Sequence, residues 1–135
     1  MKKHSVWLLG LAAVLVVGCA NQKGPAEQAV AGAETALAAV RDDAQKYVPD
    51  RLQAVDAQLA ALKDRLAKGD YRAALTGAPT VNSAIRSSGV DSLKSMWSEA
   101  SNASASGDFT TAVTKAQAVK DKAAEIMRSL GMSAG

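Results

Sequence analysis

The stretch DRLQAVDAQLAALKDRLAKGDYRAAL, residues 50–75, decides the fold of this chain. Its large apolar residues recur at alternating spacings of three and four, which places them on one face of an α-helix. They are Leu52, Val55, Leu59, Leu62 and Leu66. Gly69 can adopt the left-handed conformation that ends a helix, and Asp70 can cap a second helix that begins at Tyr71. The stretch therefore predicts two amphipathic helices that a tight turn forces to run antiparallel.

The same turn recurs 38 residues later, where Ser106-Gly107-Asp108-Phe109 corresponds to Lys68-Gly69-Asp70-Tyr71. The apolar positions also correspond at this shift. Leu52 aligns with Val90, Val55 with Leu93, Leu59 with Trp97 and Val81 with Val119. The sequence thus predicts an internal repeat, in which each unit is a helix, a Gly-Asp turn and a helix begun by an aromatic residue.

The chain before and after these turns shows the same helical spacing. Residues 25–47 form one predicted helix, with Pro25 in its first turn. Pro49 should end it, and Asp50 is the expected N-cap of the helix that follows. Residues 109–130 form the last predicted helix.

Between the two Gly-Asp turns the sequence predicts interruptions. Gly77 and Pro79 should kink or break the helix that begins at Tyr71. Ser87-Ser88-Gly89 should form a turn before another helix at 90–104. We therefore expect an all-α fold of four to five antiparallel amphipathic helices, arranged as a bundle or as a short array of helical hairpins.

The N-terminal residues indicate export and a lipid anchor. Lys2 and Lys3 precede an apolar run, residues 6–17, which is shorter than the ~20 residues of a membrane-spanning helix. The run ends in Val16-Val17-Gly18-Cys19, which resembles the lipobox of bacterial lipoproteins. That resemblance implies cleavage after Gly18 and a diacylglycerol on the Cys19 thiol. An ordinary secretory signal with a chance cysteine is the alternative.

This interpretation divides the chain into four parts. Residues 1–18 would be a signal peptide, residues 19–24 the lipidated cysteine and a tether, residues 25–131 the helical domain, and residues 132–135 a flexible tail. The acyl chains would bind the lipid bilayer of the cell envelope. In lipoproteins of two-membrane bacteria an Asp after the cysteine retains the protein in the inner membrane. Ala20 at that position implies the periplasmic face of the outer membrane, if the organism has one.

Two further resemblances concern the helical part. The Gly-Asp-aromatic turn, followed by Ala and by Leu or Val, resembles the middle of a tetratricopeptide repeat, where a hairpin turns at Gly and a small Ala packs on the first helix. The match covers about half of each unit, and the family's large first-helix residues and closing proline are missing. The chain after Cys19 also resembles short, uncharacterised bacterial lipoproteins with Ala-rich helices and a Gly-Asp-Tyr turn. These resemblances imply helical hairpins and no particular chemistry.

Composition excludes several classes of function. His4 and Cys19 are the only histidine and cysteine, and His4 would leave with the signal peptide. The domain therefore cannot hold a Ser-His-Asp triad, a Cys-His pair or a zinc site of Cys and His, and we expect neither metal nor cofactor. The chain has 16 basic and 13 acidic residues, and two of the basic ones, Lys2 and Lys3, lie in the signal. The domain is thus close to neutral, and nucleic acid is not an expected partner.

The aromatic residues are the candidate binding residues. Tyr71, Trp97 and Phe109 lie on the apolar stripes, so packing in the core is the first expectation. The alternative is that they line a groove between hairpins, because aromatic residues are enriched in binding hot spots. In that case the Ser- and Asn-rich residues 98–106 could form a polar rim, although they could equally be a mobile helix end.

These features favour a non-catalytic binding or scaffolding lipoprotein that presents a helical surface to another envelope protein. A structural lipoprotein that self-associates is the second interpretation, since long apolar stripes also suit homo-oligomers. A hydrolase that uses carboxylates alone is the third. Its one adjacent acidic pair is Asp42-Asp43, whose side chains would point ~100° apart on a helix and could not converge on one bond.

Overall fold

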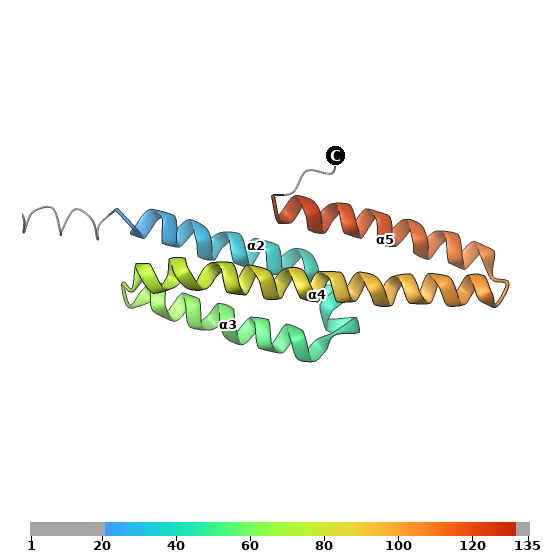
Figure 1. The fold of residues 1–135 in the computed structure, drawn as a ribbon, viewed down its shortest axis with the longest axis horizontal. Helices are drawn as coiled ribbons and strands as arrows, with labels where there is room; N and C mark the ends of the chain where they lie inside the picture. The colour runs from blue at the N-terminus through green and yellow to red at the C-terminus, as the bar shows by residue number, and fades with distance from the viewer. Residues whose placement is uncertain (1–20, 132–135) are drawn as a thin grey trace, which may run out of the picture.

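The structure is a computed structural model that describes residues 21–131, and this part of the chain contains four α-helices (Figure 1). α2 spans Lys23–Tyr47, α3 spans Pro49–Ala67, α4 spans Tyr71–Ala105 and α5 spans Phe109–Ser129. The predicted all-α fold is confirmed. The predicted signal peptide (1–18) with its predicted cleavage residue Gly18, the predicted lipidation residue Cys19 and the predicted tail (132–135) lie outside the described residues.

Helix α4 is the axis of the molecule. α2 and α3 pack against its first half and form a three-helix bundle, whereas α5 packs against its second half (Figure 1). α2 runs in the same direction as α4, and α3 and α5 run in the opposite direction. We call α3 with residues 71–88 the first hairpin, and residues 89–105 with α5 the second hairpin. The two hairpins share α4, and α2 lies along the first one.

The core lies between α2, α3 and the first half of α4. Leu37, Val40 and Ile85 are among its largest fully buried side chains. Alanines such as Ala33 and Ala74 occupy several other positions and are also fully buried, and these small side chains let the helix axes approach closely. Each buried Leu, Val or Ile contributes about 1.5–3 kcal/mol. The first hairpin and α2 therefore supply most of the apolar burial that holds the fold.

The two Gly-Asp turns have the same geometry. Gly69 has a φ of 77° and Gly107 a φ of 82°, in the left-handed region that glycine adopts without strain. The Asp70 carboxylate accepts a hydrogen bond from the backbone N of Ala73 (3.2 Å), and that of Asp108 accepts one from the backbone N of Thr111 (3.0 Å). Both predicted turns and both predicted aspartate N-caps are confirmed.

The predicted N-cap of α3 is wrong. Val48 occupies that position and Pro49 is the first helical residue, so Asp50 lies inside the first turn. Proline suits this place because the backbone N–H that it lacks would have no partner within the helix. α2 and α3 are therefore joined by the single residue Val48.

Helix α4 passes through both predicted interruptions. The predicted break at Gly77 and Pro79 does not occur, and the predicted turn at Ser87-Ser88-Gly89 is wrong. A proline inside a helix costs ~3 kcal/mol. Here Pro79 faces solvent, while Ala78 and Val81 beside it are buried in the core. Tertiary packing of these neighbours offsets the loss and keeps the helix continuous.

The Ser-Gly segment of α4 is a helix crossing. Ser88 donates its hydroxyl hydrogen to the carbonyl of Ala84 (3.0 Å), so this buried side chain is satisfied within the helix and needs no turn. A Cβ atom on Gly89 would lie 3.1 Å from Cγ1 of Val40 and 3.3 Å from Cδ1 of Ile126. Gly89 is therefore the point where α2, α4 and α5 meet.

Candidate binding groove

None of the four described helices covers one face of the second hairpin. Within residues 21–131 the exposed large apolar side chains are Val90, Trp97, Phe109 and Val113, and all four belong to this hairpin. Trp97 is 58% exposed and Phe109 is 67% exposed. Exposed aromatic residues that gather on one face are typical of an interaction surface.

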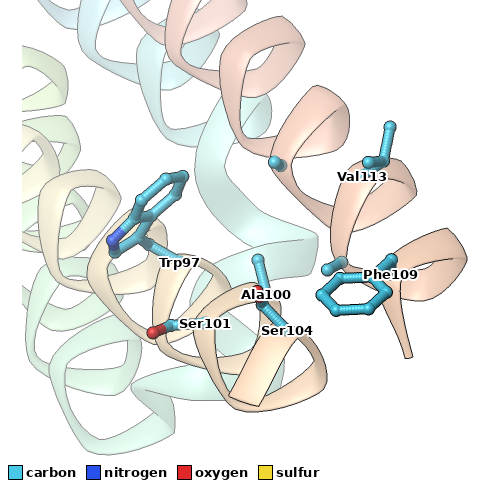
Figure 2. A pocket seen from close by; sticks show the side chains of 8 residues that line it. Trp97, Ala100, Ser101, Ser104, Phe109 and Val113 are labelled. Carbon is cyan, nitrogen blue, oxygen red and sulfur yellow. The ribbon is translucent and has the colours of Figure 1, made fainter. Parts of the chain in front are cut away.

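Trp97, Phe109 and Val113 border an open groove of about 340 Å³ between α4 and α5. Its floor is made of Ala100, Ala112 and Ala116, and hydroxyls of Ser101 and Ser104 lie along α4. Figure 2 shows Trp97 on one side and Phe109 with Val113 on the other, with small residues between them. No lining residue is titratable. The groove therefore offers apolar contact and a few hydroxyl groups, and its lining residues include no carboxylate, amine or imidazole.

The repeat explains how the groove arises. In the first hairpin Leu59 is 8% exposed because α2 covers it, and the residue 38 positions later is Trp97. Leu62 is buried between α3 and α4, and its counterpart is Ala100, which fills less space. The second hairpin thus combines smaller residues at its centre with larger ones at its edges, which leaves a hollow.

The three candidate aromatic residues fall into two groups: Trp97 and Phe109 line the groove, and Tyr71 packs against the core. The core interpretation of Trp97 and Phe109 is wrong, because both are exposed and lie together at the groove. Tyr71 packs half-buried against the core at the start of α4 and does not line the groove. Val113 was not among the predicted groove residues, although its alignment with Leu75 in the repeat places it on the apolar face of its helix. The serines of residues 98–106 belong to α4, which stays helical as far as Ala105.

The opposite face of the second hairpin is closed by polar contacts with α2. Lys115 donates to Oε2 of Glu99 (2.6 Å), and the hydroxyl of Tyr47 donates to the same oxygen (3.3 Å). The hydrogen bond from Lys115 is the main reason why the pKa of Glu99 is lowered. Oδ2 of Asp43 lies 3.1 Å from Nζ of Lys122, so Asp43 belongs to an interhelix ion pair. These contacts leave the groove face as the uncovered side.

Two lysines near the first turn are paired on the surface. Lys68 binds Asp64 within α3 (2.7 Å), and Lys63 binds Glu34 of α2. Both lysines are solvent-exposed, so these pairs contribute little to stability. They agree with ordinary surface pairing and do not form a second site.

In the region from residue 21 to residue 131, no three His, Cys, Asp or Glu side chains come together as potential metal ligands. None of the four helices described is both long and apolar enough to span a bilayer. The chain matches no protein-family model, no curated protein and no solved structure.

Proposed function

We propose that this protein is a lipid-anchored envelope lipoprotein that acts as a non-catalytic binding module, with the groove of the second hairpin as its binding site. The observation that carries the proposal is the uncovered face that bears Trp97 and Phe109. Burying these two rings against a partner would remove on the order of 200 Å² of aromatic surface from water, which favours association.

The shape of the molecule supports an anchor at one end and a site at the other. α2 begins at Lys23, which follows Cys19 closely in the sequence, and the turn between α4 and α5 lies at the opposite end of the long axis from this start (Figure 1). α4 has 35 residues, so this axis extends roughly 50 Å. A domain tethered through Cys19 would hold the groove away from the bilayer surface, where it is accessible to an envelope protein.

The anchor is tested by metabolic labelling with palmitate. The proposal expects label in the wild-type protein, and expects Cys19→Ser to abolish labelling and release the protein from the membrane fraction. A serine variant that remains membrane-bound, or a wild-type protein without label, would contradict the lipoprotein assignment.

The binding site is tested by photo-crosslinking in intact cells. A photoreactive amino acid replaces Val113 in the groove, and Gln53, an exposed residue of α3, serves as the matched control. We expect a discrete crosslinked envelope protein at Val113, and we expect it to vanish when Trp97→Ala is added. Identical sets of neighbours at the two positions would contradict a binding role for the groove.

Self-association is the second candidate function, because the exposed rings of Trp97 and Phe109 could also be buried against another copy. Sedimentation of the purified full chain in detergent separates the two possibilities. A dimer that dissociates with Trp97→Ala supports self-association, and a strict monomer excludes it.

A further inference from the structure

The groove occupies the position that α2 has on the first hairpin. On α3, Leu59 and Lys63 border α2, and the residues 38 positions later, Trp97 and Ser101, line the groove. On the first half of α4, Ala74 and Ala78 are buried in the core, and their counterparts Ala112 and Ala116 form the groove floor. Both walls of the groove therefore correspond to surfaces that a helix covers elsewhere in the same molecule.

α2 shows what kind of helix fits such a surface. Its buried face is made mostly of small residues at spacings of three and four, among them Ala26, Val30, Ala33 and Val40. It runs antiparallel to α3 and parallel to α4 (Figure 1). By the correspondence of the two hairpins, a helix in the groove would run antiparallel to α4 and parallel to α5.

Charged residues at the edge distinguish the two positions. α2 is joined to α3 by ion pairs of Arg41 with Asp56 and of Glu34 with Lys63. The residue 38 positions after Asp56 is Lys94, and the one after Lys63 is Ser101. Lys94 has a side chain that is 74% exposed, 3.6 Å from Asp91. A helix docked as α2 docks would bring the counterpart of Arg41 beside this lysine, where a cation is repelled and a carboxylate is attracted.

We propose that the groove binds an amphipathic partner helix of the α2 kind, with a face of small apolar residues and with a carboxylate beside Lys94. This inference rests on the proposed function and specifies the chemistry of the partner. A second copy of the chain is the less suitable occupant, because its own α2 is buried within its first bundle.

The probe for this proposal is a fluorescein-labelled peptide of residues 23–47 that carries Arg41→Glu. The unmodified peptide of the same residues is the reference. Binding to the purified full chain in detergent is read by fluorescence anisotropy. We expect the Arg41→Glu peptide to bind roughly three- to tenfold more tightly than the reference, because it replaces a like-charge contact at Lys94 by an ion pair.

Two variants of the full chain locate the bound peptide. Lys94→Glu should reverse the preference between the peptides, and Trp97→Ala should weaken both about tenfold. Lys68→Glu is the matched control, because Lys68 is an equally exposed lysine outside the groove, and it should change neither affinity. Binding that ignores both Lys94 and Trp97 would mean that the peptide exchanges with α2 in the first bundle, and would overturn the proposal.

The remaining outcomes separate this proposal from the proposed function. If neither peptide binds while crosslinking at Val113 captures an envelope protein, the binding function stands and the helical partner is wrong. A crosslinked dimer at Val113 would show that a second copy fills the groove, and would also overturn the proposal. If neither experiment gives a signal, both the partner and the binding function fail.

Discussion

The two hairpins have the same turn and opposite surroundings. At Gly69-Asp70 and at Gly107-Asp108 the backbone takes the same left-handed step and an aspartate caps the next helix in the same way. Yet the first hairpin is buried under α2, while the corresponding face of the second is open. The local sequence therefore determines how each hairpin turns. The presence or absence of a third helix over its face determines whether that face is buried or accessible.

The difference follows from the side of the second hairpin on which α2 lies. α2 ends on the face opposite the groove, where Tyr47 donates to Glu99, after it has met α5 near the middle of the molecule. At this meeting point Asp43 pairs with Lys122, and Val40 and Ile126 close on Gly89. The groove face of the second hairpin lies on the other side, with Trp97 and Ala100 where the first hairpin has Leu59 and Leu62. Stability is thus concentrated in one half of the molecule and accessible apolar surface in the other.

The largest effect should come from truncating corresponding residues in the two hairpins. Leu59→Ala removes a buried side chain and should lower the free energy of unfolding by about 2–5 kcal/mol, as in other cores. Trp97→Ala removes a mostly exposed ring and should cost about 1 kcal/mol or less. Urea unfolding followed by circular dichroism measures both. Equal losses would show that the second hairpin is covered in solution.

The next effect concerns the crossing point. Gly89→Leu would force Val40 and Ile126 apart and should cost about 1–3 kcal/mol. Amide hydrogen exchange should accelerate most in α5, because this helix packs mainly against the second half of α4 and makes fewer contacts with α2.

Gly32 provides the control for this substitution. It lies within α2, and an added Cβ atom would have no neighbour within 4 Å. Gly32→Ala should therefore stabilise the protein by about 0.5–1 kcal/mol through helix propensity. For Gly89→Leu itself, an equal acceleration of amide hydrogen exchange in α3 and α5 would mean that the two hairpins unfold as one unit.

Much of the fold could be predicted from the sequence, because helical spacing and Gly-Asp turns act locally. The continuity of α4 could not. Serine and glycine at Ser88-Gly89 have the local properties of a turn, and only the approach of Val40 and Ile126 shows that a small residue is needed for a helix crossing. The spacing of residues reports which face is apolar, and it does not report whether another helix crosses there.

The candidate site was predictable in part for the same reason. The apolar stripes carry Tyr71, Trp97 and Phe109 alike, and their spacing could not show that Trp97 and Phe109 are exposed while Tyr71 is half-buried. The exposure of Trp97 depends on the face of the second hairpin over which α2 passes, because Tyr47 of α2 contacts Glu99 on the side opposite the groove. The spacing of residues does not report on which side of a hairpin another helix lies, so it could not identify the uncovered face.

A smaller effect should test whether the turns are equivalent. Gly69→Ala and Gly107→Ala each place a Cβ atom on a left-handed residue, which costs about 1–2 kcal/mol. Neither added atom meets a close neighbour, so the two losses should agree within about 0.5 kcal/mol despite the different surroundings. Asparagine at either position should cost less, since it tolerates this conformation. A clearly larger loss at Gly69 would mean that α2 constrains the first turn.

The smallest effect concerns the cap of the uncovered hairpin. Hydrogen bonds from the Thr111 side chain and backbone lower the pKa of Asp108 below its value in the unfolded chain, which is about 3.9. The folded state then binds fewer protons than the unfolded state, so this carboxylate stabilises the fold above about pH 4 and less as the pH falls through its folded pKa. Asp108→Asn keeps an acceptor oxygen and does not titrate.

We therefore expect the melting temperature of the wild type to exceed that of Asp108→Asn by a constant amount between about pH 5 and 7. This range lies about one to three units above the unfolded pKa, so the carboxylate stays charged throughout it. The difference should shrink as the pH falls below the unfolded pKa and through the lower folded pKa, because the carboxylate becomes protonated. All other acids are shared by the two proteins, so they cancel in the comparison. A difference that stays the same at low pH would mean that the charge of Asp108 does not contribute, and that the uncovered hairpin is held at its turn by Gly107 and the neutral cap alone.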